Sequence, residues 1–167
     1  NVLQTQDHPQ FKTYSEELKW LTTDPTRMTW VANTIKDIAT SGNTLILVDR
    51  ISAGEMLEKK IKDSVFVSGS TKNMERKEQY DEISTATNKV IIATYGVAAV
   101  GINIPRIFNL VLIEPGKSFV RVIQSIGRGI RKAEDKDSVQ IWDITSSCKF
   151  AKRHLGARKK FYKEANY

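Results

Sequence analysis

Residues 119–131 read FVRVIQSIGRGIR, a stretch with two different helical faces. At 100° per residue, the apolar side chains fall on one side of the predicted helix: Phe119, Val122, Ile123, Ile126 and Ile130. The opposite side carries, within about 80° of rotation, Arg121, Gln124, Arg128 and Arg131. A fixed row of guanidinium groups suits phosphate, because each group stays charged and binds phosphate oxygens bidentately. The spacing therefore indicates either a phosphate-binding face or a basic face exposed to water.

Two glycines, Gly127 and Gly129, lie within this predicted helix. Each costs about 1 kcal/mol relative to alanine in a helix interior. Glycine has no Cβ, so it is favoured where a ligand or another backbone comes near. The pair therefore suggests a close approach to this helix.

Strand patterns precede and follow the helix, at residues 109–113 and 138–144. Three earlier strands are predicted at residues 44–48, 65–67 and 89–94, and the first of these is a continuous apolar run, as in strands buried on both faces. Helical patterns occupy most of the intervals, at residues 13–21, 25–41, 52–62 and 74–84. Strands that alternate with helices form right-handed β-α-β units. The sequence therefore predicts an α/β fold, with a parallel sheet and helices on both faces.

Local signals set the expected ends of these elements. Asp24 followed by Pro25 predicts a helix start with Asp24 as the N-cap. Ser52, with Glu55 three residues later, matches a capping box and is the predicted cap of the next helix. Residues 1–12 are polar and expected to be extended or poorly ordered. Residues 95–105 are expected to form a loop with one helical turn.

The composition is that of a soluble domain with a polyanionic partner. The chain has 167 residues, 40% of them hydrophobic and 27% charged, with a net charge of +7. Its one cysteine, Cys148, excludes an internal disulfide and fits a reducing, cytoplasmic compartment. His8 and His154 add no metal-ligand cluster, and no apolar run reaches membrane-spanning length. Because the chain begins without Met, we expect a fragment or a processed product.

The last residues of the chain, 149–167, are strongly basic. The cations there are Lys149, Lys152, Arg153, Arg158, Lys159, Lys160 and Lys163. Such a run is usually a solvated face or a frayed terminus. Phe150, Phe161 and Tyr162 are interleaved with the cations, and this favours contact with a nucleic-acid backbone.

A possible phosphate-binding P-loop at residues 116–118, Gly-Lys-Ser, does not fit its motif. The P-loop pattern requires a glycine at position 111, where this chain has Val111, and Pro115 removes a backbone N–H. No acidic Mg²⁺ box follows an apolar strand either, since Asp81 and Glu82 lie in a polar helical pattern. The chain therefore has arginines suited to nucleotide phosphates but no P-loop to bind those phosphates. This combination is expected of half of an active site.

Four motifs resemble those of superfamily 2 helicases. Residues 124–131 match Q-x-x-G-R-x-x-R, motif VI, and residues 93–105 resemble motif V. Residues 44–50 and 67–71 resemble motifs IV and IVa. The resemblance covers roughly residues 44–145. It implies the second RecA-like domain of a helicase, with residues 44–147 as its core, residues 1–43 as a linker with helices leading into the domain, and residues 148–167 as a basic C-terminal tail.

The resemblance also implies roles in ATP hydrolysis. ATP and Mg²⁺ would be bound mainly by a first RecA-like domain of the same polypeptide, so the isolated chain is expected to be inactive. Arg131 resembles an arginine finger, and Arg128 and Gln124 would contact the γ-phosphate or its attacking water. Gly101 and Asn103 would lie near the ribose. Asn103 stands where the family usually has Asp, which puts a charged pairing with a motif VI arginine in doubt.

For the nucleic acid, the resemblance implies contacts to the backbone rather than to the bases. The predicted contacts are Arg50, Ser68, Gly69, Thr71 and Thr94, with Lys149, Lys152 and Arg153 added from the tail. The resemblance favours DNA, single-stranded or branched, in recombination, repair and replication. The alternatives are an RNA helicase domain and a non-catalytic RecA-like module that binds nucleic acid. An enzyme with its own small substrate is disfavoured, because no G-x-G-x-x-G follows the first strand.

Overall fold

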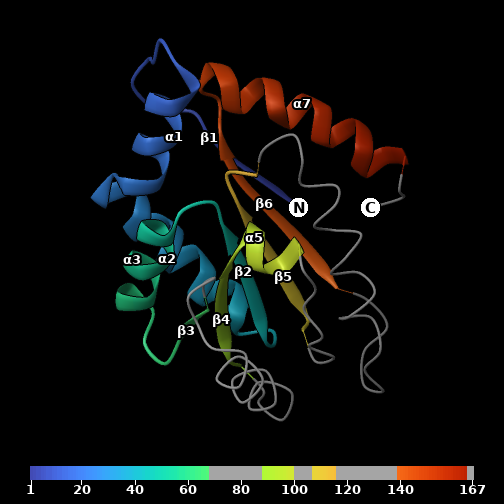
Figure 1. The fold of residues 1–167 in the computed structure, drawn as a ribbon. Helices are drawn as coiled ribbons and strands as arrows, with labels where there is room; N and C mark the ends of the chain where they lie inside the picture. The colour runs from blue at the N-terminus through green and yellow to red at the C-terminus, as the bar shows by residue number, and fades with distance from the viewer. Residues whose placement is uncertain (68–87, 100–106, 116–138, 165–167) are drawn as a thin grey trace.

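The computed structural model describes residues 1–67, 88–99, 107–115 and 139–164 (Figure 1). In chain order the elements are β1 (Val2–Thr5), α1 (Tyr14–Thr23), α2 (Pro25–Ala39), β2 (Thr44–Val48), α3 (Ile51–Lys60), β3 (Val65–Val67), β4 (Val90–Thr94), α5 (Tyr95–Ala99), β5 (Asn109–Ile113), β6 (Gln140–Ser146) and α7 (Lys149–Glu164). The helices predicted at residues 74–84 and 119–131 lie outside the described residues.

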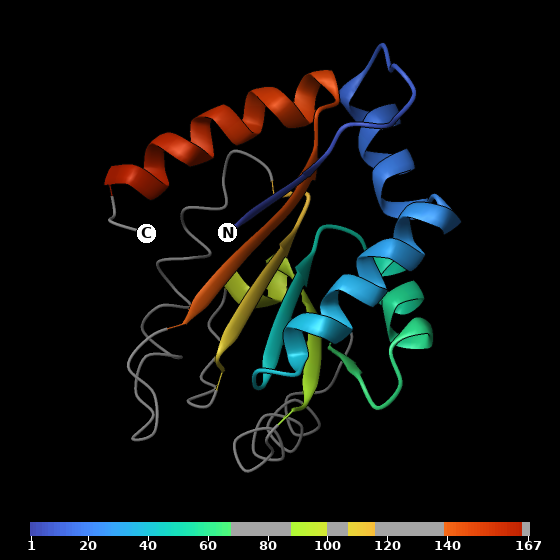
Figure 2. The same cartoon turned by 180° about the vertical axis from the view of Figure 1, so that it is seen from behind.

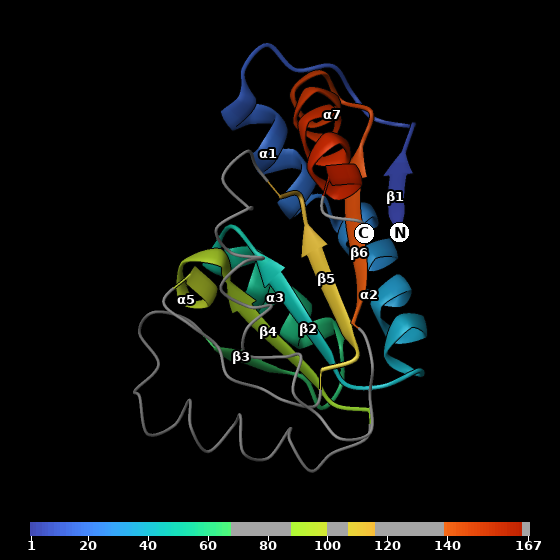
Figure 3. The same cartoon turned by 90° about the vertical axis from the view of Figure 1, so that its right-hand side faces the viewer.

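Six strands form one sheet in the order β1-β6-β5-β2-β4-β3, and every pair of neighbours is parallel. Val48 of β2 lies beside Thr94 of β4, and Ile113 of β5 lies beside Ile144 of β6. The strands therefore end together at one carboxyl edge, as their arrowheads show in Figure 3. The predicted parallel α/β fold is confirmed.

Helices cover both faces of the sheet, which explains why every residue of β2 and of β5 is buried. Ile46 and Val48 pack with α2 and α3 on one face (Figure 2). Leu45 and Leu47 pack with α5 on the other face, where Phe161 and Tyr162 of α7 join the same cluster. Continuous apolar strands are the expected pattern for a sheet covered on both sides.

The start of α2 agrees with the sequence prediction. Asp24 is the N-cap, its carboxylate accepts a hydrogen bond from the Arg27 backbone N–H at 2.9 Å, and Pro25 opens the helix. After α2 the chain turns at Gly42, whose φ is +152°. A Cβ on Gly42 would meet the Phe108 ring, so the turn into β2 requires glycine for both conformation and space.

The capping box predicted at Ser52 is wrong. Helix α3 begins at Ile51, with Arg50 at the N-cap and no side-chain cap, and the Arg50 carbonyl accepts from the Gly54 N–H at 3.2 Å. The physical reason is the short connection, because only two residues separate the end of β2 from the first helical residue. Ser52 therefore lies inside the first turn rather than before it.

The N-terminal residues are better ordered than the sequence suggested. Val2 to Thr5 form an edge strand that pairs with β6, and the Asn1 and Thr5 carbonyls both accept backbone hydrogen bonds at 2.8 Å from Asp143 and Ser147. The sequence predicted that this segment is extended or poorly ordered. For Val2 to Thr5 the backbone is extended, and it is ordered by its pairing with β6. Tertiary pairing with β6 fixes a segment that is too short to give a strand pattern of its own.

A frayed terminus, one of the two usual interpretations of such a basic run, is wrong for residues 149–164. Residues Lys149–Glu164 form helix α7, which packs against β6 and crosses one end of the sheet (Figure 1). Arg158, counted among the surface cations, is only 1% exposed. Phe161 and Tyr162, expected to face nucleic acid, pack against the core cluster instead. Residues 1–5 and 149–164 are therefore part of one folded structure, while the predicted three-part division stays a prediction.

Candidate nucleotide and nucleic-acid site at the carboxyl edge

The predicted site residues fall into two groups. Outside the described residues lie Arg131, Arg128, Gln124, Gly101, Asn103, Ser68, Gly69 and Thr71. The structure describes Arg50, Thr94, Lys149, Lys152 and Arg153. The geometry below concerns the second group and the residues that surround it.

Arg50 and Thr94 come to the same edge of the sheet. Arg50 follows β2 by two residues, and Thr94 is the last residue of the neighbouring strand β4. Thr94 lies beside Val48, the last residue of β2. Both residues are half-buried. The Thr94 hydroxyl accepts a hydrogen bond from the Val97 N–H at 3.3 Å and so caps the short helix α5. The strand register therefore brings two of the five described contacts, Arg50 and Thr94, to one carboxyl edge.

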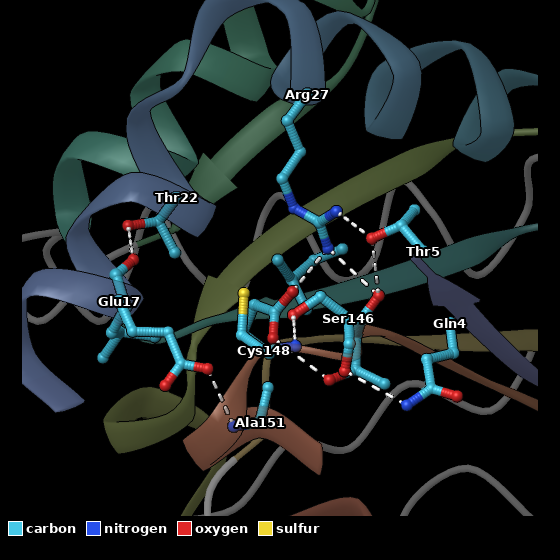
Figure 4. Close-up of polar contacts among 12 residues, drawn as sticks. Gln4, Thr5, Glu17, Thr22, Arg27, Ser146, Cys148 and Ala151 are labelled. Atoms are coloured by element: carbon cyan, nitrogen blue, oxygen red, sulfur yellow. Dashed lines mark hydrogen bonds and ion pairs between the residues drawn. The ribbon is translucent and has the colours of Figure 1, made fainter. Parts of the chain in front are cut away.

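Glu114 follows β5 at this edge and is the centre of a buried polar cluster. Its carboxylate accepts from Arg27 Nη2 at 2.6 Å and from the Thr145 hydroxyl at 3.2 Å. Arg27 Nη1 donates to the Thr5 hydroxyl at 2.6 Å, as Figure 4 shows. Glu114 has a φ of +45°, which is unusual for a residue other than glycine. The cluster joins α2, β1, β5 and β6 where the chain leaves β5.

Burial raises the pKa of the Glu114 carboxyl to about 7, although the Arg27 guanidinium and the Thr145 hydroxyl both act to lower it. The side chains of Glu114 and Arg27 are only 4% and 5% exposed, so water does little to solvate the carboxylate. Its charge therefore changes near neutral pH, at the edge where the predicted site lies.

A second buried cluster, on the opposite face of the sheet, joins α7 to the same region. Arg158 donates through Nε and Nη2 to the Asp143 carboxylate at 2.7 and 2.9 Å, and through Nη1 to the Pro115 carbonyl at 2.6 Å. The Tyr162 hydroxyl donates to Asp143 at 2.6 Å. Burial acts to lower the pKa of Arg158, but the hydrogen bonds and charge of Asp143 outweigh burial and raise it. The cluster fixes the backbone at Pro115, which directly precedes the segment carrying motif VI.

Helix α7 is fixed at its first turn by Glu17 of α1. The Glu17 carboxylate accepts from the backbone N–H groups of Phe150 and Ala151 at 3.0 and 2.9 Å, and Glu17 is only 1% exposed (Figure 4). An anion at a helix N-terminus satisfies free N–H groups and the positive end of the helix dipole. The predicted contacts Lys149, Lys152 and Arg153 are exposed on the first turns of this anchored helix.

Sequence reasoning gave no partner to Glu17, Glu114 or Asp143, and it missed the buried role of Arg158. Asp143 offered one signal, because it is a single acidic residue between apolar residues of a predicted strand. A buried carboxylate needs a partner, and cations lie on both sides of Asp143 in the sequence, including the basic C-terminal residues. No pattern identified which of those cations it would be.

The described part of the chain also contains a cleft away from the predicted site. A cleft of about 840 Å³ opens beside the end of β1, lined by residues that include Trp20, Arg27 and Trp30, and it contains none of the predicted site residues. Within the described ranges, no group of three or more His, Cys, Asp or Glu residues is placed to hold a metal ion. Nor does any described helix have the length and apolar character needed to cross a membrane.

Comparison with curated proteins finds two viral helicases. ATP-dependent DNA helicase uvsW of Enterobacteria phage T4 is 30% identical over 161 residues, which is 93% of this chain and 32% of that protein. Putative helicase 22 of Sulfolobus islandicus filamentous virus is 32% identical over 104 residues, 60% of this chain and 18% of that protein. This chain therefore spans about a third of the length of the first relative and less of the second.

Solved structures share the fold. The crystal structure of T4 UvsW matches with a TM-score of 0.82 at 23% identity, covering 98% of this chain and 38% of that chain. The C-terminal domain of the DEAD-box protein Dbp5 matches with a TM-score of 0.61 at 18% identity, covering 96% of this chain and 85% of that one. These likenesses identify the sheet and its helices as a RecA-like helicase C-terminal fold.

The family model described as "Helicase conserved C-terminal domain" matches residues 26–133, from α2 through the motif VI segment. The match covers more than half of the chain and includes both strands that present Arg50 and Thr94 at the carboxyl edge. The resemblance to superfamily 2 helicases is thus confirmed, and this chain belongs to the helicase conserved C-terminal domain family.

Proposed function

We propose that this chain is the second motor domain of an ATP-dependent superfamily 2 DNA helicase or translocase, which unwinds DNA or migrates branches in recombination, repair and replication. The observation that carries the proposal is the level carboxyl edge of the sheet. Arg50 and Thr94 lie there. In the sequence, the motif V segment runs from the end of β4 through α5, and the motif VI segment follows β5 and Pro115. The similarity to the T4 DNA helicase supports DNA as the nucleic acid.

The nucleotide is shared between two domains in this proposal. A first RecA-like domain of the same polypeptide holds most of the ATP and its Mg²⁺, since this chain has neither a P-loop nor an acidic box. Arg131 neutralises charge on the transferring γ-phosphoryl group, and Arg128 and Gln124 contact that group or its attacking water. Gly101 and Asn103 lie near the ribose. The buried clusters around Glu114 and Arg158 support these roles by fixing the chain just before the motif VI segment.

The nucleic acid is held by its phosphates. Arg50 and Thr94 contact the backbone, together with Ser68, Gly69 and Thr71, which follow β3 in the sequence. Hydroxyl groups and backbone N–H groups bind phosphate without reading bases, which suits a protein that moves along DNA of any sequence. ATP-driven closing and opening of the two domains then shifts this grip along one strand.

The test is an Arg131→Ala substitution in the polypeptide that carries both domains. We expect DNA-stimulated ATP turnover to fall by roughly 10³-fold or more, because the developing γ-phosphate charge loses its guanidinium. ATP binding should fall far less, and the free energy of unfolding should change by no more than about 0.5 kcal/mol, as for surface positions. Arg131→Lys should not restore turnover, because an ammonium does not reproduce the planar guanidinium.

Two results would count against this assignment. Near-normal turnover by the Arg131→Ala protein would remove Arg131 from catalysis. Early unfolding of that protein would instead give Arg131 a structural role. Parallel assays with single-stranded DNA, branched DNA and RNA decide which nucleic acid stimulates the reaction.

A further inference from the structure

Helix α7 has one face that belongs to the core and one that is exposed and uniformly basic. The exposed cations are Lys149, Lys152, Arg153, Lys159, Lys160 and Lys163. At 100° per residue they fall within an arc of about 120°. The opposite side is buried, through Ala151, His154, Leu155 and Arg158. Glu164, the last residue of α7, is its only acidic residue. We call the six cations, with Gly156 between them, the α7 basic face.

The α7 basic face is held in place at both ends. Glu17 binds the first turn through the N–H groups of Phe150 and Ala151. Arg158 and Tyr162 bind Asp143 further along the helix, at 2.7 and 2.6 Å. At about 1.5 Å per residue, the face extends roughly 21 Å from Lys149 to Lys163. One DNA strand presents a phosphate about every 3.4 Å of helix axis, so this length faces about six phosphates.

Gly156 lies at the middle of the face and distinguishes it from an ordinary solvated surface. Glycine is the least favourable helix residue after proline, so its presence in a helix interior calls for a reason. Internal packing gives none, because a Cβ built on Gly156 meets no atom within 4 Å. A missing side chain at the centre of a cationic arc leaves the helix backbone open to close approach by a ligand.

We propose that the α7 basic face binds the phosphate backbone of nucleic acid along its whole length, with the closest approach at Gly156. The inference rests on the proposed function for its partner, and it narrows the predicted basic run to six exposed cations around one glycine, without the buried Arg158. Helix α7 packs on β6, two strands away from β2, which presents Arg50. At about 4.8 Å per strand spacing, the two contact regions lie near enough for one nucleic acid to reach both.

The experiment compares two triple variants of the 167-residue chain that lose the same charge. One is Lys152→Gln, Lys160→Gln and Lys163→Gln on α7. The control is Lys36→Gln, Lys59→Gln and Lys62→Gln, which are exposed around α2 and α3 on the other face of the sheet. Fluorescence anisotropy with a labelled 20-nucleotide single strand and with the matching duplex gives Kd from about 50 to 200 mM salt. Circular dichroism confirms that each variant is folded.

We expect the α7 triple variant to bind at least tenfold more weakly than the control variant in low salt. Its log–log salt slope on the single strand should be shallower by about 2, since three phosphate contacts are lost at about 0.7 each. Equal weakening by both triple variants would overturn the inference, because it would show a dependence on net charge alone. The Kd values for the duplex show whether the α7 basic face prefers double-stranded or single-stranded DNA.

Gly156 is tested without any change of charge. Gly156→Gln should raise the melting temperature, because glutamine is a better helix former, and should weaken binding about tenfold by blocking the close approach. Ala157→Gln is the matched control, since Ala157 is exposed and lies outside the arc. Unchanged binding by Gly156→Gln would overturn the close approach at Gly156.

The controls separate this inference from the proposed function. If the unmodified chain binds nucleic acid and the α7 variants bind equally well, the inference fails and the proposed function stands. If the unmodified chain binds neither strand form with a salt-dependent Kd, the proposed function fails and the inference fails with it. Binding to anionic lipid vesicles in place of nucleic acid would also overturn the inference.

Discussion

Glu114 combines a buried ionisable group with a position beside the predicted site. Its pKa of about 7 in the folded protein lies above its ordinary value of 4.5, because burial disfavours the charged form. Between these two values the folded protein binds more protons than the unfolded chain. The contribution of Glu114 to the free energy of unfolding therefore falls as pH rises from about 4.5 to about 7. At about 1.4 kcal/mol per pKa unit, the fall is roughly 3 kcal/mol.

The corresponding prediction concerns Glu114→Gln, which keeps the size of the side chain and removes its titration. Urea unfolding at pH 5 and at pH 8 should show a smaller loss of stability with rising pH in this variant than in the unmodified protein. Glu55→Gln, an exposed residue of α3, is the control and should keep the original pH profile. A Glu114→Gln profile that parallels the unmodified one would show that Glu114 ionises normally in the folded protein.

At the scale of single residues, sequence patterns predicted neither the burial nor the partners of the buried charges. Arg158 stood in a run of cations and was counted with them, but its position in α7 turns it inward toward Asp143. Helical periodicity can show that a side chain points toward the core. It does not show that a charged side chain in that position has an ion-pair partner. The ion pair between Arg27 and Glu114 spans 87 residues of sequence, so no local pattern could reveal it.

At the scale of elements, the strands in the middle of the sheet were readable and the edge strand was not. β2 and β5 are covered on both faces, so burial requires apolar residues at every position and leaves a plain signal. β1 is only four residues long, two apolar and two polar, and is half-exposed at the edge of the sheet, so its side-chain pattern is short and mixed. Its place depends on backbone hydrogen bonds to β6, and backbone bonds leave no side-chain pattern.

The anchoring of α7 by Glu17 leads to a prediction for that helix. Glu17→Ala leaves the N–H groups of Phe150 and Ala151 without their acceptor at a buried helix start. We expect a loss of about 2 kcal/mol in the free energy of unfolding, measured by urea denaturation. Glu16→Ala removes the neighbouring, exposed carboxylate of α1 and should cost no more than about 0.5 kcal/mol. Equal losses in the two variants would show that Glu17 does not anchor α7.

At the scale of the whole molecule, the sequence motifs predicted half of an active site. The fold explains how a chain with only half of a site can form a complete folded domain. The sheet is covered on both faces and its carboxyl edge is fixed by two buried clusters, so the chain is held in place up to Pro115, directly before the segment that carries the proposed arginines. Fixed donors stabilise developing charge without reorganisation during the reaction. In the proposed two-domain site, the residues that bind the triphosphate come from other sequence, which the family match does not describe.

This division predicts that the purified 167-residue chain hydrolyses no ATP, whether single-stranded DNA, branched DNA or RNA is added. The reason is chemical: the chain has no P-loop sequence, so its arginines have no positioned triphosphate on which to act. Phosphate release is the measurement, and the Arg131→Ala form of the same chain is the control. Turnover that persists in the control comes from a contaminating ATPase. Turnover that disappears with Arg131 would show that this chain positions a triphosphate by itself, and would contradict its assignment as the second half of a two-domain site.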